Sequence, residues 1–281
     1  MTNTTFQVVF LSELYILFTN LIDNQNKLIL ETFQEDCSSL VLLPKIDQLI
    51  NKQDPTLEDI LEICSHNESL LQKLTRRGGF GNNCEEFAKE ILFKKGLSFL
   101  KSLAIRTMNQ EIFKLPLGLQ NISEPILKKR SVILARFTKH YNELLGLKAD
   151  DAYLCGLFYN LSYVSYEKLV VAKVFNEDNF EEFRNDSSQA TAEALCDIGF
   201  DNNITSFVAD SAKDLFSTSF PLGHALTRIG NGLLIHAEQS SLTGSAGIDR
   251  NLLDATGLTT REIINVMKVL TRDYKGGTHR Q

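Results

Sequence analysis

Residues 153–162 read YLCGLFYNLS, and the interpretation of the whole chain depends on this stretch. Its apolar spacing is typical of a metal-binding helix, in which Gly156 and Leu157 lead into an apolar turn. The positions where metal ligands would follow hold Tyr159 and Asn160. Tyrosine is protonated near neutral pH and asparagine is a weak neutral ligand. The stretch therefore predicts the helix without the metal.

Apolar residues recur at helical spacing on both sides of this stretch, and alternating strand patterns are scarce. Just upstream, one helical pattern ends at Gly146, and Asp150 is placed to cap the next helix. The members of that pattern are Leu127, Ser131, Leu134, Phe137, Tyr141 and Leu145. Residues 115–125 hold two prolines and a glycine and predict an internal boundary. The chain is predicted to be all-α.

Local signals also predict where individual helices begin. Thr56 with Asp59 and Thr259 with Glu262 have the spacing of a capping box, the second before a helix over residues 263–270. The pair Leu43-Pro44 predicts the start of a new element, because proline favours the first helical turn.

Composition excludes several classes of protein. The 281 residues include 29 basic and 35 acidic ones, and this net charge of -6 lacks the basic footprint of a nucleic-acid binder. Five cysteines without a C-x-x-C pair predict reduced thiols in a cytoplasmic protein. The apolar residues 6–22 carry polar interruptions and no basic start, so neither a signal peptide nor a membrane span is expected.

Other candidate sites have simpler explanations. The glycine-rich residues 76–83 lack the Lys-Ser or Lys-Thr pair of a phosphate loop and predict a connection between helices. No two of the five histidines have the H-x-x-x-H spacing of zinc ligands. The acidic side chains of residues 177–186 are interpreted as a solvated helix face.

The order of short motifs along the chain is informative. In the first half, Leu43-Pro44 precedes a helix over residues 56–64, then come NESLL at 67–71, Phe80-Gly81, and Ile91-Leu92 with Gly96. The second half holds KRS at 129–131, GLFYNLS at 156–162, DS at 186–187, DS at 210–211 and Asn231. In this order the chain resembles the HDOD family (HD-related output domain), a bacterial signalling relative of the HD metal-dependent phosphohydrolases. The resemblance runs from about residue 43 to about residue 240, most of the chain.

The resemblance implies a metal site whose ligands have been replaced. Lys129-Arg130-Ser131 stands where HD enzymes place their first metal-binding histidine, ahead of serine, so that Arg130 adds positive charge where a cation would sit. Tyr159 and Asn160 replace a His-Asp pair. Ser187 replaces a further histidine, and Asn231 lies where HD enzymes keep a last aspartate. An HD site needs imidazoles and carboxylates to hold the metals that activate water. A vestigial site with no metal, no cofactor and no hydrolysis is therefore expected.

The resemblance also implies a fold of two packed helical lobes, the second of them HD-like. The expected divisions are an N-terminal helical extension over residues 1–42, a first lobe over 43–120, the HD-like lobe over 121–272 and a flexible tail over 273–281. The strongly apolar helix in the extension must be buried, because each large side chain left in water costs about 1.5–3 kcal/mol. It packs either on its own chain or on a second copy, so the protein is expected to be a monomer or a homodimer.

Three functions follow from the resemblance. The first is a non-catalytic bacterial signalling protein that acts through contacts with a signalling partner. The alternative is a sensor in which Arg130, Tyr159 and Asn160 line a pocket for a small anionic, nucleotide-like ligand. The third is a divergent phosphohydrolase. A filled cleft beside an exposed apolar patch favours the first function, and a pocket with convergent polar groups favours the second.

Overall fold

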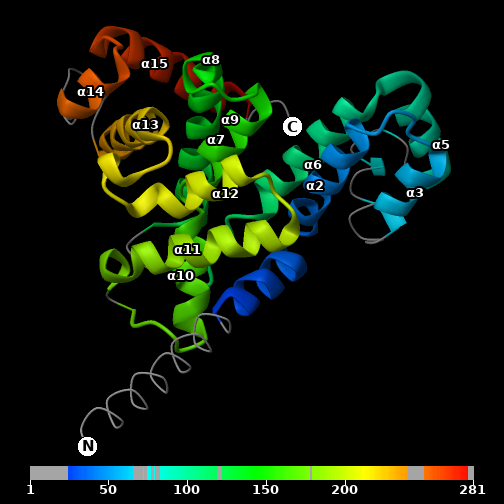
Figure 1. Cartoon of the computed structure of the whole chain (residues 1–281), viewed down its shortest axis with the longest axis horizontal. Coiled ribbons are helices and arrows are strands. Elements are labelled where there is room, and N and C mark those ends of the chain that lie inside the picture. Colours follow the sequence, from blue (N-terminus) through cyan, green and yellow to red (C-terminus); the bar gives the residue numbers. More distant parts are fainter. Residues whose placement is uncertain are drawn as a thin grey trace, which may run out of the picture.

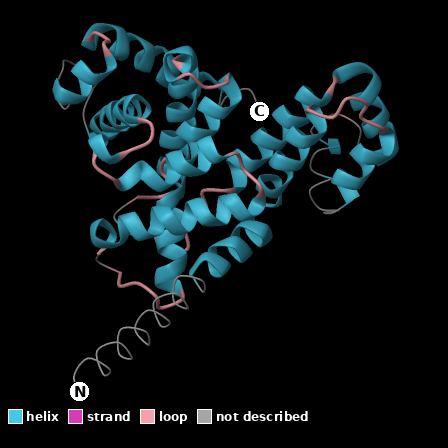
Figure 2. Cartoon of the chain, viewed as in Figure 1, coloured by secondary structure: helices cyan, strands magenta, loops and turns pink. Residues whose placement is uncertain are grey.

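The computed structural model describes residues 25–65, 72, 75, 76, 79, 83–118, 122–177, 179–239 and 250–277. Within these ranges all regular structure is helical and there is no strand, so the all-α prediction is confirmed (Figure 2). None of the described helices is long and apolar enough to cross a membrane. The predicted helix over residues 6–22 and the proposed cap at Asn67 lie outside the described residues.

The first group of helices lies on one side of the molecule (Figure 1). It comprises α2 (Ser38–Ile50), α3 (Leu57–Ser65), α5 (Cys84–Glu90), the π-helix η1 (Ile91–Lys95) and α6 (Leu97–Glu111). The predicted capping box before α3 is present, because the Asp59 carboxylate accepts from the Thr56 N–H at 2.8 Å and the Asp59 N–H donates to the Thr56 hydroxyl.

Helix α2 corrects the prediction that a new element starts at Leu43. It begins at Ser38, and Pro44 lies inside it. Proline removes one helical hydrogen bond, but Leu40, Ile46 and Leu49 are buried where α2 packs on α6, and this packing outweighs the local preference. The predicted limit of the N-terminal extension at residue 42 therefore falls within a helix.

The second group follows an irregular link and contains the remaining helices (Figure 1). They are α7 (Glu124–His140), α8 (Asn142–Leu145), α9 (Ala149–Phe158), α10 (Leu161–Val171), α11 (Phe180–Ile198), α12 (Asn202–Ala209), η3 (Asp210–Ala212), η4 (Leu215–Ser217), α13 (Pro221–Gln239), α14 (Arg250–Thr256) and α15 (Thr260–Gly277). Gly146 ends α8 with a φ of 65°, as its position predicts. Helix α9 is preceded by Lys148 as its N-cap residue, two positions before the predicted Asp150.

The last helix is longer at both ends than its pattern predicts. The capping box of Thr259 and Glu262 is present, with the Thr259 N–H donating to the carboxylate at 2.8 Å. From there α15 runs to Gly277, so the predicted start of the tail at residue 273 is too early. Leu270 and Tyr274 pack against the core, which explains why the helix continues.

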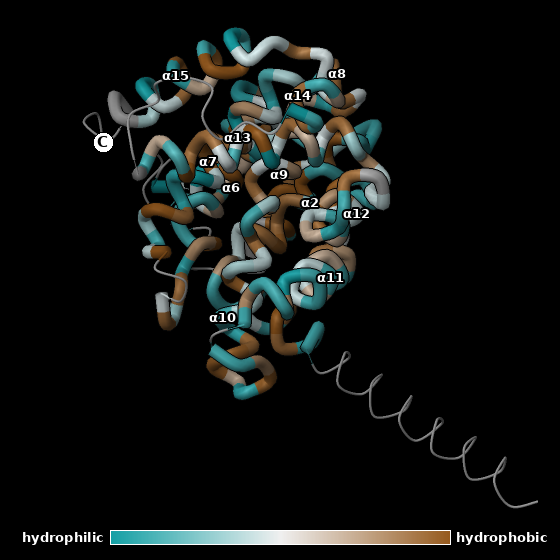
Figure 3. Tube along the Cα trace, turned by 90° about the vertical axis from the view of Figure 1, so that its left-hand side faces the viewer, coloured by the Kyte–Doolittle hydropathy of each residue, from teal (hydrophilic) through white to brown (hydrophobic). Residues whose placement is uncertain are grey.

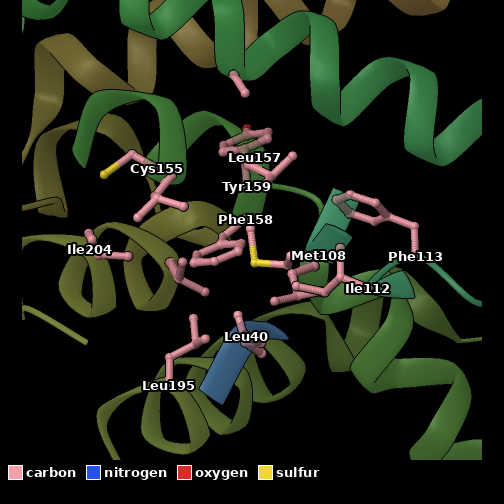
Figure 4. Packing of buried hydrophobic residues seen from close by; sticks show 14 of the residues in the cluster. Leu40, Met108, Ile112, Phe113, Cys155, Leu157, Phe158, Tyr159, Leu195 and Ile204 are labelled. Atoms are coloured by element: carbon pink, nitrogen blue, oxygen red, sulfur yellow. The ribbon is translucent and has the colours of Figure 1, made fainter. Parts of the chain in front are cut away.

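Helices α7 and α9 cross at very short range. A methyl group at Gly156 would lie 2.7 Å from the Leu134 carbonyl oxygen and 2.8 Å from the Ala135 Cα, and would also meet the Thr138 hydroxyl. Only glycine therefore permits this crossing. Hydrophobic stretches gather around α2 and α9 in the middle of the molecule (Figure 3). Leu40 of α2 and Met108 of α6 reach the same buried cluster as Phe158 of α9 (Figure 4).

The second half of the N-terminal extension packs on its own chain. Residues 25–36 are helical, and the Asp36 carboxylate accepts from Lys168 of α10 at 2.7 Å. Asn26 donates to Glu193 of α11, while Ile29 is fully buried. Residues 25–36 of the predicted extension therefore pack on their own chain, while the packing predicted for the apolar helix over residues 6–22 stays a prediction.

Candidate functional site

The stretch 153–162 is divided between two helices. Helix α9 ends at Phe158 and α10 begins at Leu161, with Tyr159 and Asn160 in the break. Tyr159 keeps helical backbone angles, whereas Asn160 has φ -99° and ψ 9°. Both side chains are buried, at 3% and 2% exposure. The pattern predicts a helix here but does not show where it breaks.

Asn160 and Asn231 meet across the fold. The Asn160 Nδ2 group donates to the Asn231 Oδ1 atom at 3.4 Å, which links the α9–α10 break to the middle of α13. The two residues are 71 positions apart in the chain. The resemblance placed them in one vestigial site, and the structure brings them together.

Arg130 forms an ion pair within the protein. Its guanidinium group forms a bidentate pair with Glu238 of α13, with the Nε atom 2.9 Å and 3.1 Å from the two carboxylate oxygens. The two side chains are only 13% and 18% exposed. A charge-assisted pair of this kind neutralises the arginine. Among the described residues, Arg130 does not line the pocket that holds Tyr159.

Ser187 also lies apart from that pocket. It is fully buried in α11, and its hydroxyl donates to the Phe183 carbonyl oxygen of the same helix at 2.8 Å. This hydrogen bond satisfies the hydroxyl within its own helix. Of the five predicted site residues, Ser187 is therefore the one whose contacts are most local.

A cavity of about 310 Å³ adjoins the α9–α10 break. Of the five predicted site residues, Tyr159 and Asn231 line it. The other lining residues are Arg184, Ser211, Ala212, Lys213, Asp214, Arg228, Gly232 and Ile235. Three of these side chains are cationic and one is anionic. We call this space the basic cavity.

The wall of the basic cavity is fixed by hydrogen bonds around Asp210. Its carboxylate accepts from the Lys213 ammonium at 2.7 Å and from the Ser219 N–H at 2.7 Å. Burial alone would raise the pKa of Asp210, but these hydrogen bonds hold it below the usual value. The Arg228 guanidinium donates to the Lys213 carbonyl oxygen and ties this turn to α13. Lys213 and Arg228 are therefore held in place without a ligand.

A buried histidine lies behind this wall. His224 is fully buried, stacks on Phe207 at a centroid distance of 4.3 Å, and has no hydrogen-bond partner on either ring nitrogen among the described residues. Burial, together with the positive charge of Arg228, lowers its pKa from 6.5 to about 4. His224 is therefore neutral near pH 7.

The three cationic residues of the basic cavity were not predicted from the sequence. Arg184 lies among the acidic residues interpreted as a solvated face, and Lys213 follows a short 3-10 helix. The available signal was the spacing of Arg228 and Asn231, since residues three apart share a helix face. The described residues contain no group of three or more His, Cys, Asp or Glu side chains placed to hold a metal ion.

Comparison of this chain with protein-family models, with curated proteins and with solved structures finds no match. The resemblance to the HDOD family therefore stays a prediction, carried by the motifs quoted above.

Proposed function

We propose that this chain is a non-catalytic bacterial regulatory protein of HDOD type that binds a small anionic ligand in the basic cavity. One observation carries the proposal: Arg184, Lys213 and Arg228 come from three separate segments and line one cavity with Tyr159 and Asn231. Two of the vestigial positions are thus beside three cationic side chains, of which Lys213 is paired with Asp210 at 2.7 Å and the two arginines are not closely paired among the described residues. A pocket with convergent polar groups favours ligand binding over a filled cleft.

The cations suit an oxyanion. A guanidinium group presents donors in a planar fork that matches phosphate or carboxylate oxygens, whereas an ammonium group acts as a point charge. Arg228 uses a donor on the Lys213 carbonyl and has others left. Arg184 has its nearest carboxylate, Glu181, at 3.8 Å, and that carboxylate is 79% exposed. Such a pair is weak and competes poorly with a bound anion.

The absence of catalysis remains part of the proposal. Tyrosine and asparagine at 159 and 160 are poor metal ligands, and the Asn160 amide is hydrogen-bonded to Asn231. Arg130, which is paired with Glu238, stands where the resemblance places the first metal-binding histidine, and a guanidinium group has no lone pair to offer a metal. Nothing in these contacts favours the phosphohydrolase alternative.

Contacts with a signalling partner, which the sequence analysis placed first, also stay a prediction. Among the described residues, the exposed large hydrophobic side chains each lie on a different segment of the chain. They are Ile50, Phe93, Leu117, Leu144, Val171 and Val269. Single exposed hydrophobic residues are normal on a protein surface. We therefore place ligand binding ahead of the partner contact, with cytoplasmic localisation as in the sequence analysis.

Thermal unfolding with added anions tests the proposal. Inorganic phosphate should raise the Tm of the wild type at constant ionic strength, and at one hundred times its Kd the added stability should reach about 2.7 kcal/mol. The variants R184Q and R228Q should lose most of this effect. Arg106 on α6 is exposed and distant in sequence, so R106Q serves as the matched control and should keep it. Equal shifts in all four proteins would contradict the proposal.

Elemental analysis tests the non-catalytic part separately. Purified protein should contain no stoichiometric divalent metal and should not hydrolyse nucleoside triphosphates or cyclic dinucleotides. One or two Mn, Fe or Ni ions per chain would overturn this part of the proposal and would favour the phosphohydrolase alternative.

A further inference from the structure

The charges of the basic cavity are mixed in a way that limits the ligand. Arg184 and Arg228 attract an anion and Lys213 is paired with Asp210 at 2.7 Å, but Asp214 lines the same space. The Asp214 carboxylate makes no ion pair among the described residues. An anion that filled the whole cavity would be repelled at this point. The ligand must therefore carry its negative charge on one part and hydrogen-bond donors on another.

The uncharged polar groups favour hydroxyl groups on that second part. The Asn231 amide has both donor and acceptor capacity, and only its Oδ1 atom is engaged, by Asn160 at 3.4 Å. Ser211 shares one hydrogen bond with Ser188 at 3.0 Å and has acceptor capacity left. A hydroxyl both donates and accepts, so it matches a carboxylate, an amide and a serine at once.

The cavity offers little to a flat aromatic ring. Of the described side chains that line it, Tyr159 is the aromatic one, and it is 3% exposed. Its ring face is therefore not available for stacking, which is how proteins usually hold nucleobases. The apolar lining is limited to Ala212, Gly232 and Ile235. A volume of about 310 Å³ is at the lower end of the range of ligand pockets, about 300–1,000 Å³.

We propose that the ligand is a small phosphorylated polyol, such as a sugar phosphate. The cations bind its phosphate group, while Asp214 and Asn231 bind its hydroxyl groups. This inference rests on the proposed function and narrows it, because it replaces a nucleotide-like ligand with one that lacks a base. It also makes Asp214 the residue that favours binding of polyol phosphates over anions without hydroxyl groups, such as inorganic phosphate.

Calorimetric titration of the full chain distinguishes the candidate ligands. The probes are ribose phosphate, glycerol phosphate, inorganic phosphate, adenosine monophosphate and neutral ribose. A hydrogen bond to a charged group is worth about 1.5–3 kcal/mol, so ribose phosphate should bind about tenfold or more tightly than inorganic phosphate. Ribose should not bind measurably, and adenosine monophosphate should bind no more tightly than ribose phosphate.

The variant D214N tests the binding of the hydroxyl groups separately from the binding of the phosphate group. Asp214 is exposed at the cavity, so the change should leave the fold intact. Ribose phosphate should lose about tenfold in affinity, since the charged acceptor is gone. Inorganic phosphate should keep its affinity or gain, because a repulsive charge has been removed. The variant R184Q should weaken both ligands, and R106Q should weaken neither.

The outcomes separate the two proposals. If inorganic phosphate binds as tightly as ribose phosphate, or D214N weakens both equally, the polyol inference is wrong and anion binding stands. Tighter binding of adenosine monophosphate than of ribose phosphate also overturns the inference, in favour of a nucleotide. If no phosphate compound binds to the wild type, the proposed function fails together with it.

Discussion

The two ends of α9 present cavities of similar size and opposite character. At the start of the helix, Asp150 and Asp151 line a cavity of about 370 Å³ together with other charged residues. These are Asp47, Lys101, Lys148 and Asp201. At the other end, Tyr159 lines the basic cavity of about 310 Å³. The acidic residues in the first turn of α9 suit the helix dipole, which favours negative charge at that end.

The difference between the two ends is in how the charges are paired. At the acidic end, the Lys101 ammonium lies 2.6 Å from an Asp47 oxygen and 3.7 Å from an Asp150 oxygen, and it is only 9% exposed. These contacts join α2, α6 and α9. At the basic end, Lys213 is paired with Asp210 at 2.7 Å, whereas Arg228 contacts a backbone carbonyl and Arg184 has only a weak surface partner. Paired charges hold helices together, and weakly paired cations are available to a ligand.

Displacing α9 from α7 should disturb the cavities at both ends of α9. The change G156A places a methyl group against the backbone of α7, so we expect a loss of about 3 kcal/mol or more in the free energy of unfolding. Urea unfolding followed by circular dichroism measures it. G146A is the control: it has open space around it and only a φ of 65° to maintain, so it should cost about 1 kcal/mol. Equal losses in the two variants would show that the α7–α9 crossing is not tight.

Protonation of His224, which lies near the basic cavity, should lower the free energy of unfolding at acidic pH. Because the pKa of His224 is lowered from 6.5 to about 4, the unfolded chain binds a proton in this interval that the folded chain does not. Stability should therefore fall as the pH drops from 6.5 to 4, by on the order of 3 kcal/mol at about 1.4 kcal/mol per pKa unit. The charged groups around the ring are Arg228, Asp210 and Lys213.

The variant H224F should remove this part of the pH dependence. A phenyl ring fills the same buried space without unpaired nitrogens, so stability at pH 7 should be equal or higher. His140 is exposed on α7, and H140Q should keep the wild-type pH dependence. An unchanged slope in H224F between pH 6.5 and 4 would mean that His224 does not become destabilising on protonation.

The variant R130A tests whether Arg130 stabilises the fold or binds the ligand. We expect R130A to lower the free energy of unfolding by about 2 kcal/mol, because it leaves the Glu238 carboxylate unpaired while partly buried. The double variant R130A/E238A should recover part of this loss. Phosphate affinity should stay within twofold of the wild type. A large loss of affinity in a folded R130A would place Arg130 in the ligand site.

The smallest loss of stability is expected for a substitution at the acidic end of α9. K101M removes the shared cation, but Asp47 and Asp150 are 37% and 48% exposed, so water compensates in part. We expect a loss of about 1 kcal/mol and unchanged ligand affinity. Lys139, whose contact with Asp150 is 3.3 Å long between half-exposed side chains, is the control, and K139M should cost less. A larger loss in K139M would contradict the structural role given to Lys101.

Local signals in the sequence predicted helix ends well. The two capping boxes and the stop at Gly146 depend on residues within one turn of each other, so their chemistry can be read from the chain. The start of α2 could not be predicted in the same way. Pro44 favours a helix start, and only packing against α6 explains why the helix begins earlier.

The candidate site was predicted in part. The resemblance placed Tyr159, Asn160 and Asn231 together, and the structure does so. The partner of Arg130 is 108 residues away, and nothing in the local sequence indicates it. The cations of the basic cavity come from segments separated by long stretches of chain, so their meeting depends on helix packing. Sequence patterns with short periods do not report such contacts.

A crystal structure of the protein with ribose phosphate tests the central claim most directly. The account predicts the phosphate group within hydrogen-bond distance of the Arg184 and Arg228 guanidinium groups, with sugar hydroxyls on Asp214 and Asn231. Ribose phosphate bound elsewhere, with the basic cavity closed by its own side chains, would contradict the claim that this cavity is a ligand site.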